Sequence, residues 1–304
     1  MTYKAGFVGL IGQPNAGKST LLNHLVEDKI SIVTPKPQTT RRRVLGVVSR
    51  DQGQVVFVDS PGVLRTQKGL NAFLTKEAED VIESSDALAA VVSIDEKKKD
   101  DVLKIINLVK ESHKPWFVII TKVDLSEKSH RVEMVKDLVR TIDPKVKIIE
   151  FSSEWKKESK EIIQDVIQTS ISLLPESKKP LYDVELFTPH SVRELVGEIV
   201  REKCFENLTK ELPYQIAVRV TNFDESKKNL TSIFADIIVS KESHKPIVIG
   251  KGAATVKAIG MQARKEIEKL VGHKVFLKLD VVIRDNWFEN PRMMKDLGYH
   301  NDRK

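Results

Sequence analysis

The chain has 304 residues, with 50 Lys and Arg against 43 Asp and Glu, so that its formal net charge is +7. Its 40% hydrophobic content excludes a mainly disordered or fibrous chain, and its length favours two domains over one. No apolar stretch approaches the roughly 20 residues of a membrane-spanning helix, and the single cysteine, Cys204, excludes an internal disulfide and indicates a reducing cytoplasm.

The first half of the chain alternates short apolar runs with amphipathic stretches. Strands are expected at 7–11, 44–48, 55–58, 87–94, 116–120 and 146–151, and helices after Gly17 and at 70–82, 102–109, 131–140 and 162–174. This rhythm predicts an α/β fold with a mostly parallel sheet covered on both faces. Ligands of such sheets lie at the carboxyl ends of the strands.

A polar, proline-punctuated stretch over 175–180 ends this alternation and predicts a boundary between a domain at 1–175, a connector at 176–190 and a domain at 191–304. Ser191 followed by Glu194 is a capping box that opens a helix, in which Cys204 is expected to be buried. Strands are expected at 214–220, 233–239 and 275–283, with two helices around Gly250. The order predicts a smaller α+β domain.

The strongest chemical signal lies between the first expected strand and the first expected helix. Residues 12–19 match the phosphate-binding loop GxxxxGK[ST], in which backbone N–H groups and a helix N-terminus hold phosphate oxygens. Lys18 would reach the terminal phosphates, and Ser19 would bind Mg²⁺. The predicted nucleotide contacts of this segment are Gly12, Gln13, Pro14, Asn15, Ala16, Gly17, Lys18, Ser19 and Thr20.

A second loop, Asp59-Ser60-Pro61-Gly62, follows the strand expected at 55–58 and therefore lies at the same edge of the sheet. An aspartate there can hold the water shell of Mg²⁺, and the Gly62 N–H can meet the γ-phosphate. Alone, this pattern also describes a common turn. Together with the phosphate-binding loop, it predicts catalytic roles for Lys18, Asp59 and Gly62, and contacts to the nucleotide from Ser60 and Pro61.

A third loop, Thr121-Lys122-Val123-Asp124, follows the strand expected at 116–120. The Asp124 carboxylate can accept hydrogen bonds from N1–H and the amino group of guanine, whereas adenine has no donor at N1. Lys122 would lie along the base. Thr121 stands where this motif usually has asparagine, but the carboxylate that selects guanine is present.

These motifs resemble those of a translation-factor-type GTPase, and further segments narrow the resemblance to the Era family of bacterial GTPases. The segments are Pro37-Gln38-Thr39-Thr40-Arg41, Glu211-Leu212-Pro213-Tyr214, 245–250, Ile259-Gly260, Ala263-Arg264-Lys265 and Leu297-Gly298-Tyr299. The resemblance implies a Ras-like P-loop GTPase domain followed by a type II KH domain. It also implies binding of GTP and GDP with Mg²⁺, slow intrinsic hydrolysis, and a role in maturing the 30S ribosomal subunit through the 3′ region of 16S rRNA.

The resemblance also assigns roles to single residues. Thr39 or Thr40 would sense the γ-phosphate and Mg²⁺, with Thr40 favoured, and Asn15 matches an asparagine that holds K⁺ in related GTPases. The loop at the guanine edge would be formed by Ser152 and Ser153. Val63 replaces the glutamine that orients water in other GTPases, so hydrolysis depends on positioning and on cations.

Gly250-Lys251-Gly252-Ala253 resembles the GxxG loop by which KH domains clamp an RNA backbone, except that alanine replaces the last glycine. In a left-handed conformation this alanine costs about 1–2 kcal/mol, whereas in the first turn of the next helix it costs nothing. Lys251 and Lys257 would neutralise phosphates. Without the resemblance, the segment is equally compatible with an ordinary turn between helices.

Two other functions remain open from the sequence. One is an RNA-binding assembly chaperone in which GTP sets the conformation and hydrolysis is incidental. The other is a GTPase subunit of an RNA-modifying enzyme, although the sequence shows no second catalytic motif. The modest net charge predicts a local nucleic-acid site rather than a globally basic surface. No DNA partner is expected, and peripheral association with the cell membrane is left open.

Overall fold

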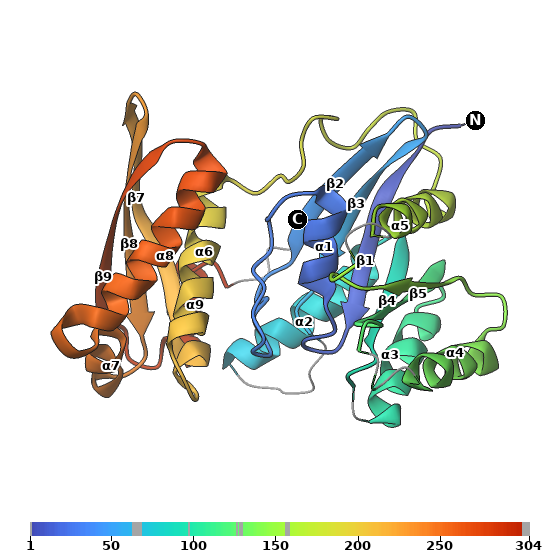
Figure 1. Cartoon of the computed structure of the whole chain (residues 1–304), viewed down its shortest axis with the longest axis horizontal. Coiled ribbons are helices and arrows are strands. Elements are labelled where there is room, and N and C mark those ends of the chain that lie inside the picture. Colours follow the sequence, from blue (N-terminus) through green and yellow to red (C-terminus); the bar gives the residue numbers. More distant parts are fainter. Residues whose placement is uncertain are drawn as a thin grey trace. The chain divides into compact units, whose positions relative to one another are not determined.

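The computed structural model describes residues 2–62, 69–96, 98–125, 127, 130–155 and 159–299. Its contacts divide the chain into two compact units (Figure 1). The first unit comprises Met1–Ser31, Thr40–Thr66 and Leu74–Pro189, and the second comprises Ile32–Thr39, Gln67–Phe73 and His190–Lys304. The short segment Ile32–Thr39 therefore groups with residues that follow it by more than a hundred positions.

The first unit is built on a six-stranded sheet in the order β2-β3-β1-β4-β5-β6. The strands are β1 (Lys4–Gly12), β2 (Val44–Arg50), β3 (Gly53–Asp59), β4 (Ala87–Ser93), β5 (Trp116–Thr121) and β6 (Ile148–Phe151). Only β2 runs antiparallel among the described strands of this sheet. Every residue of β3 and of β4 is buried, as expected for strands covered on both faces. The mostly parallel sheet predicted from the sequence is thus confirmed.

Helices cover both faces of this sheet. They are α1 (Lys18–Val26), α2 (Gly69–Ser84), α3 (Lys99–Glu111), α4 (His130–Ile142) and α5 (Ser159–Leu173). Val81 of α2, Ile105 of α3 and Val135 of α4 share one apolar cluster with alternate residues of the strands. Helices α1 and α5 contact each other and pack on β1 and β3 from the other face. The sheet is therefore a rigid platform whose carboxyl edge carries the three predicted loops.

Residues of the expected connector are fixed to the edge of this sheet. The buried Gln54 side chain accepts hydrogen bonds from the backbone N–H groups of Leu181 (2.8 Å) and Tyr182 (2.9 Å) and donates to the Tyr182 carbonyl (2.9 Å). The Val47 N–H donates to the carbonyl of Phe187 at 2.8 Å. The segment up to Pro189 therefore belongs to the first unit rather than forming a detached linker.

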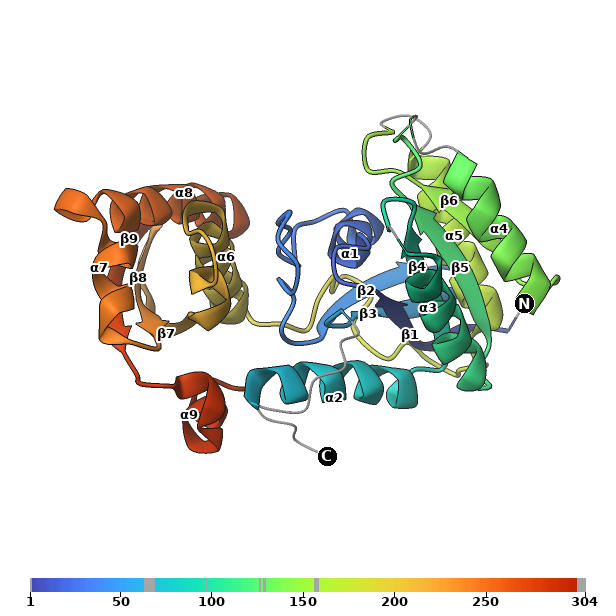
Figure 2. The ribbon, with the colours of Figure 1, turned by 90° about the horizontal axis from the view of Figure 1, so that it is seen from below.

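The second unit contains a three-stranded sheet in the order β7-β8-β9. Its elements are α6 (Val192–Asn207), β7 (Ala217–Lys227), β8 (Leu230–Val239), α7 (Lys245–Ile249), α8 (Ala254–Val271), β9 (Lys274–Ile283) and α9 (Pro291–Asp296). Strand β8 pairs antiparallel with β7 and parallel with β9. Figures 1 and 2 both draw α6 and α8 on the same side of these strands. This is the helix–strand–strand–helix–helix–strand order expected from the sequence.

In the second unit, the structure confirms the predicted start of α6 and the burial of Cys204, but not the predicted start of the first strand. Ser191 and Glu194 form the predicted capping box at the start of α6, and Cys204 is buried in this helix as expected. The prediction that a strand begins at Tyr214 is wrong, because Leu212–Gln215 forms a 3₁₀ turn before β7. Pro213 fixes its own φ and has no N–H to donate to a sheet, which favours the turn.

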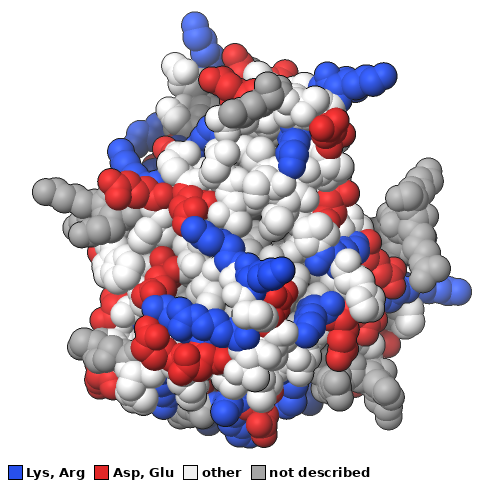
Figure 3. Space-filling model, turned by 90° about the vertical axis from the view of Figure 1, so that its right-hand side faces the viewer, with Lys and Arg blue, Asp and Glu red and all other residues white. Residues whose placement is uncertain are grey.

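The described surface shows no extended field of one charge on the face of the first unit seen in Figure 3. There, blue Lys and Arg side chains are interspersed with red Asp and Glu side chains. Among the residues that the structure describes, no helix is long and apolar enough to cross a membrane.

Candidate functional site

The loop between β1 and α1 has the backbone geometry of a phosphate cradle. Gly17 has a φ of 88°, in the left-handed region that favours glycine. A Cβ atom at Gly12 would lie only 2.3 Å from the carbonyl oxygen of Val91, so only glycine fits there. The loop ends at the first N–H groups of α1, which carry the partial positive charge of a helix N-terminus. The cradle is thus directed at an anion.

Lys18 reaches back into this loop. Its Nζ donates to the carbonyl oxygens of Gly12 (3.1 Å) and Gln13 (3.0 Å). Burial lowers the Lys18 pKa to about 8, and the nearby Asp59 carboxylate opposes this shift. A phosphate group beside the ammonium would favour its charged form. The geometry therefore suits Lys18 to the role predicted for it.

Four oxygen-bearing side chains meet at the end of β3. The Asp59 Oδ2 atom accepts hydrogen bonds from Ser19 Oγ (2.5 Å) and Ser31 Oγ (3.0 Å), and Thr40 Oγ1 lies 3.4 Å from it. The Ser19 and Thr40 hydroxyl oxygens are 2.9 Å apart. Burial raises the pKa of Asp59, while Lys18 and the three hydroxyl groups lower it. These hydroxyl and carboxylate oxygens are the kind of ligand that Mg²⁺ takes.

The second carboxylate oxygen of Asp59 gives an independent reason to place a cation here. In the part of the chain that the structure describes, Asp59 Oδ1 is buried and has no hydrogen-bond partner. A buried acceptor without a partner is costly unless another group satisfies it. The residues present therefore fit a magnesium ion held with Ser19 and Thr40.

The structure separates the two threonines, of which the sequence analysis favoured Thr40. Thr40 lies in the oxygen cluster around Asp59, whereas Thr39 Oγ1 donates to the Lys36 carbonyl (2.8 Å) and lies 2.8 Å from Thr34 Oγ1. Thr40 is therefore the one of the two whose hydroxyl lies among the oxygens that fit Mg²⁺. Thr39 stabilises a local turn within the second unit.

The segment Ile32–Thr39 is anchored to α6 in that unit. The Val33 N–H donates to Glu202 Oε1 at 2.9 Å. Lys36 Nζ donates to the carbonyl oxygens of Phe205 and of Leu208, the latter at 2.5 Å. These carbonyls lie at the carboxyl end of α6, where a cation is favoured. The residue that precedes Thr40 thus belongs to a turn that the second unit holds.

Sequence reasoning missed Ser31 and the residue that positions it. Asn23 Oδ1 accepts from the N–H groups of Ile30 (3.0 Å) and Ser31 (2.9 Å), and its amide donates to the Ser31 carbonyl (2.8 Å). This arrangement directs the Ser31 hydroxyl to Asp59. Polar contacts of this kind have no periodicity and match no short motif, so the sequence carried no signal for them.

The loop that follows Asp59 lies against the phosphate loop. Ser60 Oγ donates to the Leu10 carbonyl at 2.8 Å, and a Cβ atom at Gly62 would lie 2.6 Å from the backbone nitrogen of Pro14. Only glycine allows this approach, which brings the Gly62 backbone close to the expected phosphates. Pro61 lies between these two contacts. Val63, which the sequence places next, lies outside the described residues.

The expected guanine-binding loops also meet. Ser152 Oγ donates to Asp124 Oδ1 and accepts from the Glu154 N–H at 3.0 Å, so Ser152 orients the carboxylate predicted to select guanine. Thr121 Oγ1 donates to the Ala16 carbonyl at 2.7 Å, which ties this loop to the phosphate loop. Ser153 is exposed at the same edge.

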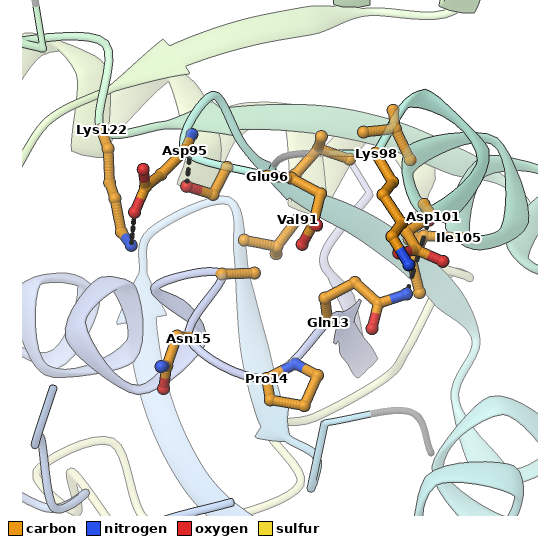
Figure 4. Close-up of a pocket in the computed structure, with 14 residues that line it drawn as sticks. Gln13, Pro14, Asn15, Val91, Asp95, Glu96, Lys98, Asp101, Ile105 and Lys122 are labelled. Carbon is orange, nitrogen blue, oxygen red and sulfur yellow. Dashed lines mark hydrogen bonds and ion pairs between the residues drawn. The ribbon is translucent and has the colours of Figure 1, made fainter. Parts of the chain in front are cut away.

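A pocket of about 340 Å³ lies beside the phosphate loop. Its lining includes Gln13, Pro14 and Asn15 from that loop, Asp95, Glu96 and Lys122 from the segments after β4 and β5, and Lys98 at the start of α3. In Figure 4 the Lys122 side chain extends toward Asp95, and its Nζ lies 3.7 Å from Asp95 Oδ2. The pocket marks the carboxyl edge of the sheet, where the fold predicts a ligand.

The predicted RNA-binding loop has positive φ at three of its four residues, and Gly252 and Ala253 adopt the left-handed conformation. The φ angles are 76° at Gly250, 60° at Gly252 and 64° at Ala253. Of the two conformations considered for Ala253, the structure therefore has the costly one. A Cβ atom at Gly252 would meet no atom within 4 Å. Lys251 and Lys257 are exposed beside it, so this surface is open to a phosphate backbone.

Comparison with known proteins covers both units. A family model described as 50S ribosome-binding GTPase matches residues 7–122, and a KH domain model matches residues 211–288. The GTPase Era of Syntrophus aciditrophicus is 38% identical over 299 residues, which cover 98% of this chain and 96% of that protein. The GTPase Era of Geotalea uraniireducens is 37% identical over 297 residues, covering 98% of each.

Two solved structures are similar over nearly the whole chain. One is an Era variant from Aquifex aeolicus bound to GDP·AlF4⁻, with a TM-score of 0.88. The other is Era in complex with MgGDPNP and nucleotides 1506–1542 of 16S ribosomal RNA, with a TM-score of 0.89. Each shares 32% sequence identity with this chain, and each alignment covers 98% of this chain and 100% of the solved one.

Proposed function

The chain belongs to the Era family of GTPases, and from this we propose that its GTP hydrolysis serves to regulate binding of the 3′ region of 16S rRNA during maturation of the 30S subunit. The observation that carries the proposal is the cluster of Lys18, Ser19, Thr40 and Asp59 at one edge of the sheet. It provides a cation for the phosphates and oxygen ligands for Mg²⁺. A KH domain in the same chain supports an RNA partner.

Each residue of the site has a stated part in this proposal. Lys18 and the backbone of the phosphate loop hold the β- and γ-phosphates, and Ser19, Thr40 and Asp59 hold Mg²⁺ and its water shell. When bound there, Mg²⁺ would supply positive charge to the phosphate oxygens. The Gly62 N–H contacts the γ-phosphate. Slow intrinsic turnover follows from Val63, which has no polar atom to orient water.

Nucleotide specificity tests the assignment of Asp124. The native protein should prefer GTP to ATP by several kcal/mol, because adenine has no N1–H to donate to the Asp124 carboxylate. Asp124→Asn should shift the preference toward xanthosine triphosphate, measured by competition for a fluorescent guanine nucleotide. Equal affinity of the native protein for ATP and GTP would contradict the guanine site.

A monovalent ion at Asn15 is the second part of the proposal. Asn15 is a residue of the phosphate loop and of the pocket lining (Figure 4), and an amide oxygen on this loop is a possible type of ligand for a cation near the phosphates. Turnover should be faster in K⁺ than in Na⁺ at matched ionic strength, and Asn15→Ala should remove that difference. A native rate that does not respond to the exchange would exclude Asn15 from the mechanism.

RNA binding is tested at the Gly250–Ala253 loop. Gly252→Asp places a carboxylate where phosphates approach and should lower RNA affinity at least tenfold, about 1.4 kcal/mol, with GTP affinity unchanged. Met261→Glu is the matched control, because it adds a carboxylate at an exposed position of α8 that belongs neither to this loop nor to its lysines. Unchanged RNA affinity in Gly252→Asp would mean that the loop is an ordinary turn.

The identity of the RNA is tested by crosslinking. The full-length protein is crosslinked to cellular RNA with GTP or GDP bound, and the RNA is then sequenced. Enrichment of the 3′ region of 16S rRNA in one nucleotide state supports the proposed switch. Enrichment of other RNAs in both states would contradict it.

A further inference from the structure

The sheet of the second unit has one packed face and one open face. Side chains of β9 alternate, so Val275, Leu277 and Leu279 join the apolar cluster formed with α6 and α8. Lys274, Phe276 and Lys278 lie between them in the sequence and point to the opposite face, where all three are exposed. The Phe276 side chain is 51% exposed.

A second phenylalanine continues this surface on β8. Phe234 is the register partner of Lys278, and Ser232 is that of Phe276. The centroids of the Phe234 and Phe276 rings are 6.0 Å apart with an interplanar angle of 62°. Lys278 Nζ lies 5.9 Å from the centroid of Phe234. We call Phe234, Lys274, Phe276 and Lys278 the aromatic strip.

One exposed phenylalanine needs no explanation, since folded proteins expose many apolar atoms. This face of the sheet has more than a single exposed ring. It carries two rings in contact, and a lysine lies two positions before and two positions after the exposed one. Aromatic rings on an open sheet are suited to stacking of unpaired bases, and lysines beside them to the neighbouring phosphates. The spacing along the strand places each lysine about 7 Å from Phe276.

The charges around the strip are mixed: Lys274 and Lys278 flank the exposed ring, while Asp224 of β7 is the register partner of Ser232 and lies on the same face. Lys278 Nζ lies 3.5 Å from Asp280 Oδ2, with both side chains more than half exposed, so this ion pair contributes little and a phosphate can replace it. Asp236 and Asp280 are register partners farther along the sheet. Arg219 of β7 is the register partner of Asp236 and, like Arg284, attracts its carboxylate, so this end of the face carries charges of both signs.

We propose that the aromatic strip is a second RNA-binding surface, on which bases of single-stranded RNA stack outside the Gly250–Ala253 loop. The inference rests on the RNA binding proposed above. The two surfaces are distinct because Gly252 precedes α8 and Lys274 follows it. The 18 residues of α8 span about 27 Å. Only an RNA longer than the four nucleotides held by a GxxG loop can therefore reach both.

The test uses the full-length protein and single-stranded RNAs from the 3′ region of 16S rRNA, of about four and about 16 nucleotides. Phe276→Ala should lower the affinity for the longer RNA about tenfold and leave that for the shorter RNA within twofold. Phe276→Tyr should retain affinity because it keeps a ring, whereas Phe276→Leu should behave like Phe276→Ala. Lys278→Ala should also lower the salt dependence of binding the longer RNA, by about one phosphate contact.

Met261→Ala is the matched control, because Met261 is 62% exposed on α8 and lies outside the strip. The inference is overturned if Phe276→Ala leaves both affinities unchanged while Gly252→Asp lowers them. If neither substitution changes RNA affinity, the proposed function fails as well. Loss of a dimer in Phe276→Ala at unchanged RNA affinity would assign the strip to a contact between proteins and would also overturn the inference.

Discussion

Two adjacent alanines at the start of α8 should respond in opposite ways to the same substitution. Ala253 has φ 64° and ψ 23°, whereas Ala254 has φ −63° and ψ −42°. The first pair of angles is left-handed and the second is helical. Ala253→Gly should therefore stabilise the second unit, and Ala254→Gly should destabilise it.

The magnitudes follow from these angles. A left-handed alanine costs about 1–2 kcal/mol relative to the right-handed conformation, and glycine removes this cost. Glycine also increases the entropy of the unfolded chain, which offsets about 0.4–1 kcal/mol of the gain. The net stabilisation of Ala253→Gly should lie between about 0 and 1.6 kcal/mol, with a middle value of about 0.8 kcal/mol. At Ala254 only the unfavourable contribution remains, up to about 1 kcal/mol.

The assay follows each unit separately in the full-length protein. Trp287 is buried in the second unit, whereas Trp116 and Trp155 belong to the first. Labelling with 5-fluorotryptophan and following ¹⁹F resonances in urea gives a midpoint for each. The Trp287 midpoint should rise by about 0.3–0.5 M in Ala253→Gly and fall in Ala254→Gly, with the other midpoints unchanged. Destabilisation by both substitutions would refute the left-handed assignment at Ala253.

Three further predictions follow from the packing. Burial raises the pKa of the Cys204 thiol to about 12, so iodoacetamide should not label the folded protein at pH 8. Stability should fall as the pH rises above 9, because the thiol ionises first in the unfolded chain, and Cys204→Ala should remove this loss in urea titrations. Gly62→Ala should lower kcat/KM for GTP at least tenfold, whereas Gly197→Ala, whose Cβ would lie 3.7 Å from Val220, should leave turnover unchanged. Thr121→Val should weaken binding of GDP about tenfold, and Thr121→Ser should retain it, measured by calorimetry.

The elements and loops predicted from the sequence were those whose cause is local. The phosphate loop and the capping box at Ser191 each depend on residues within one turn or loop, so their spacing carries the information. The prediction that a strand begins at Tyr214 was wrong because it depended on the same kind of local pattern, which two structures share here. Alternating apolar residues also occur where a 3₁₀ turn enters a strand, and only Pro213 distinguished the two.

The sequence could not predict contacts between distant polar groups. The Ser31 hydroxyl meets Asp59 across 28 residues, and Gln54 binds the backbone at Tyr182 across 128 residues. Such pairs produce no periodic pattern of apolar residues in the sequence from which they could be predicted. The segment Ile32–Thr39 likewise groups with the second unit through a distant polar contact, in which Lys36 donates to a carbonyl oxygen at the carboxyl end of α6. The sequence could not decide the φ angle of Ala253, because alanine adopts helical geometry and, at a cost in energy, also the left-handed region.

Thr121 shows why a departure from a motif need not weaken a site. Its side chain is 2% exposed, and its hydroxyl donates to the Ala16 carbonyl at 2.7 Å. It thereby joins the loop that carries Asp124 to the loop that holds the phosphates. Valine has the same shape but leaves the Ala16 oxygen without this donor, a loss of about 1–3 kcal/mol for a buried group. Nucleotide affinity should therefore fall, because base and phosphates are then held by loops no longer joined at this point. If Thr121→Val binds GDP as tightly as the native protein does, the Ala16 contact does not position the guanine loop, and Ser152 beside Asp124 must suffice.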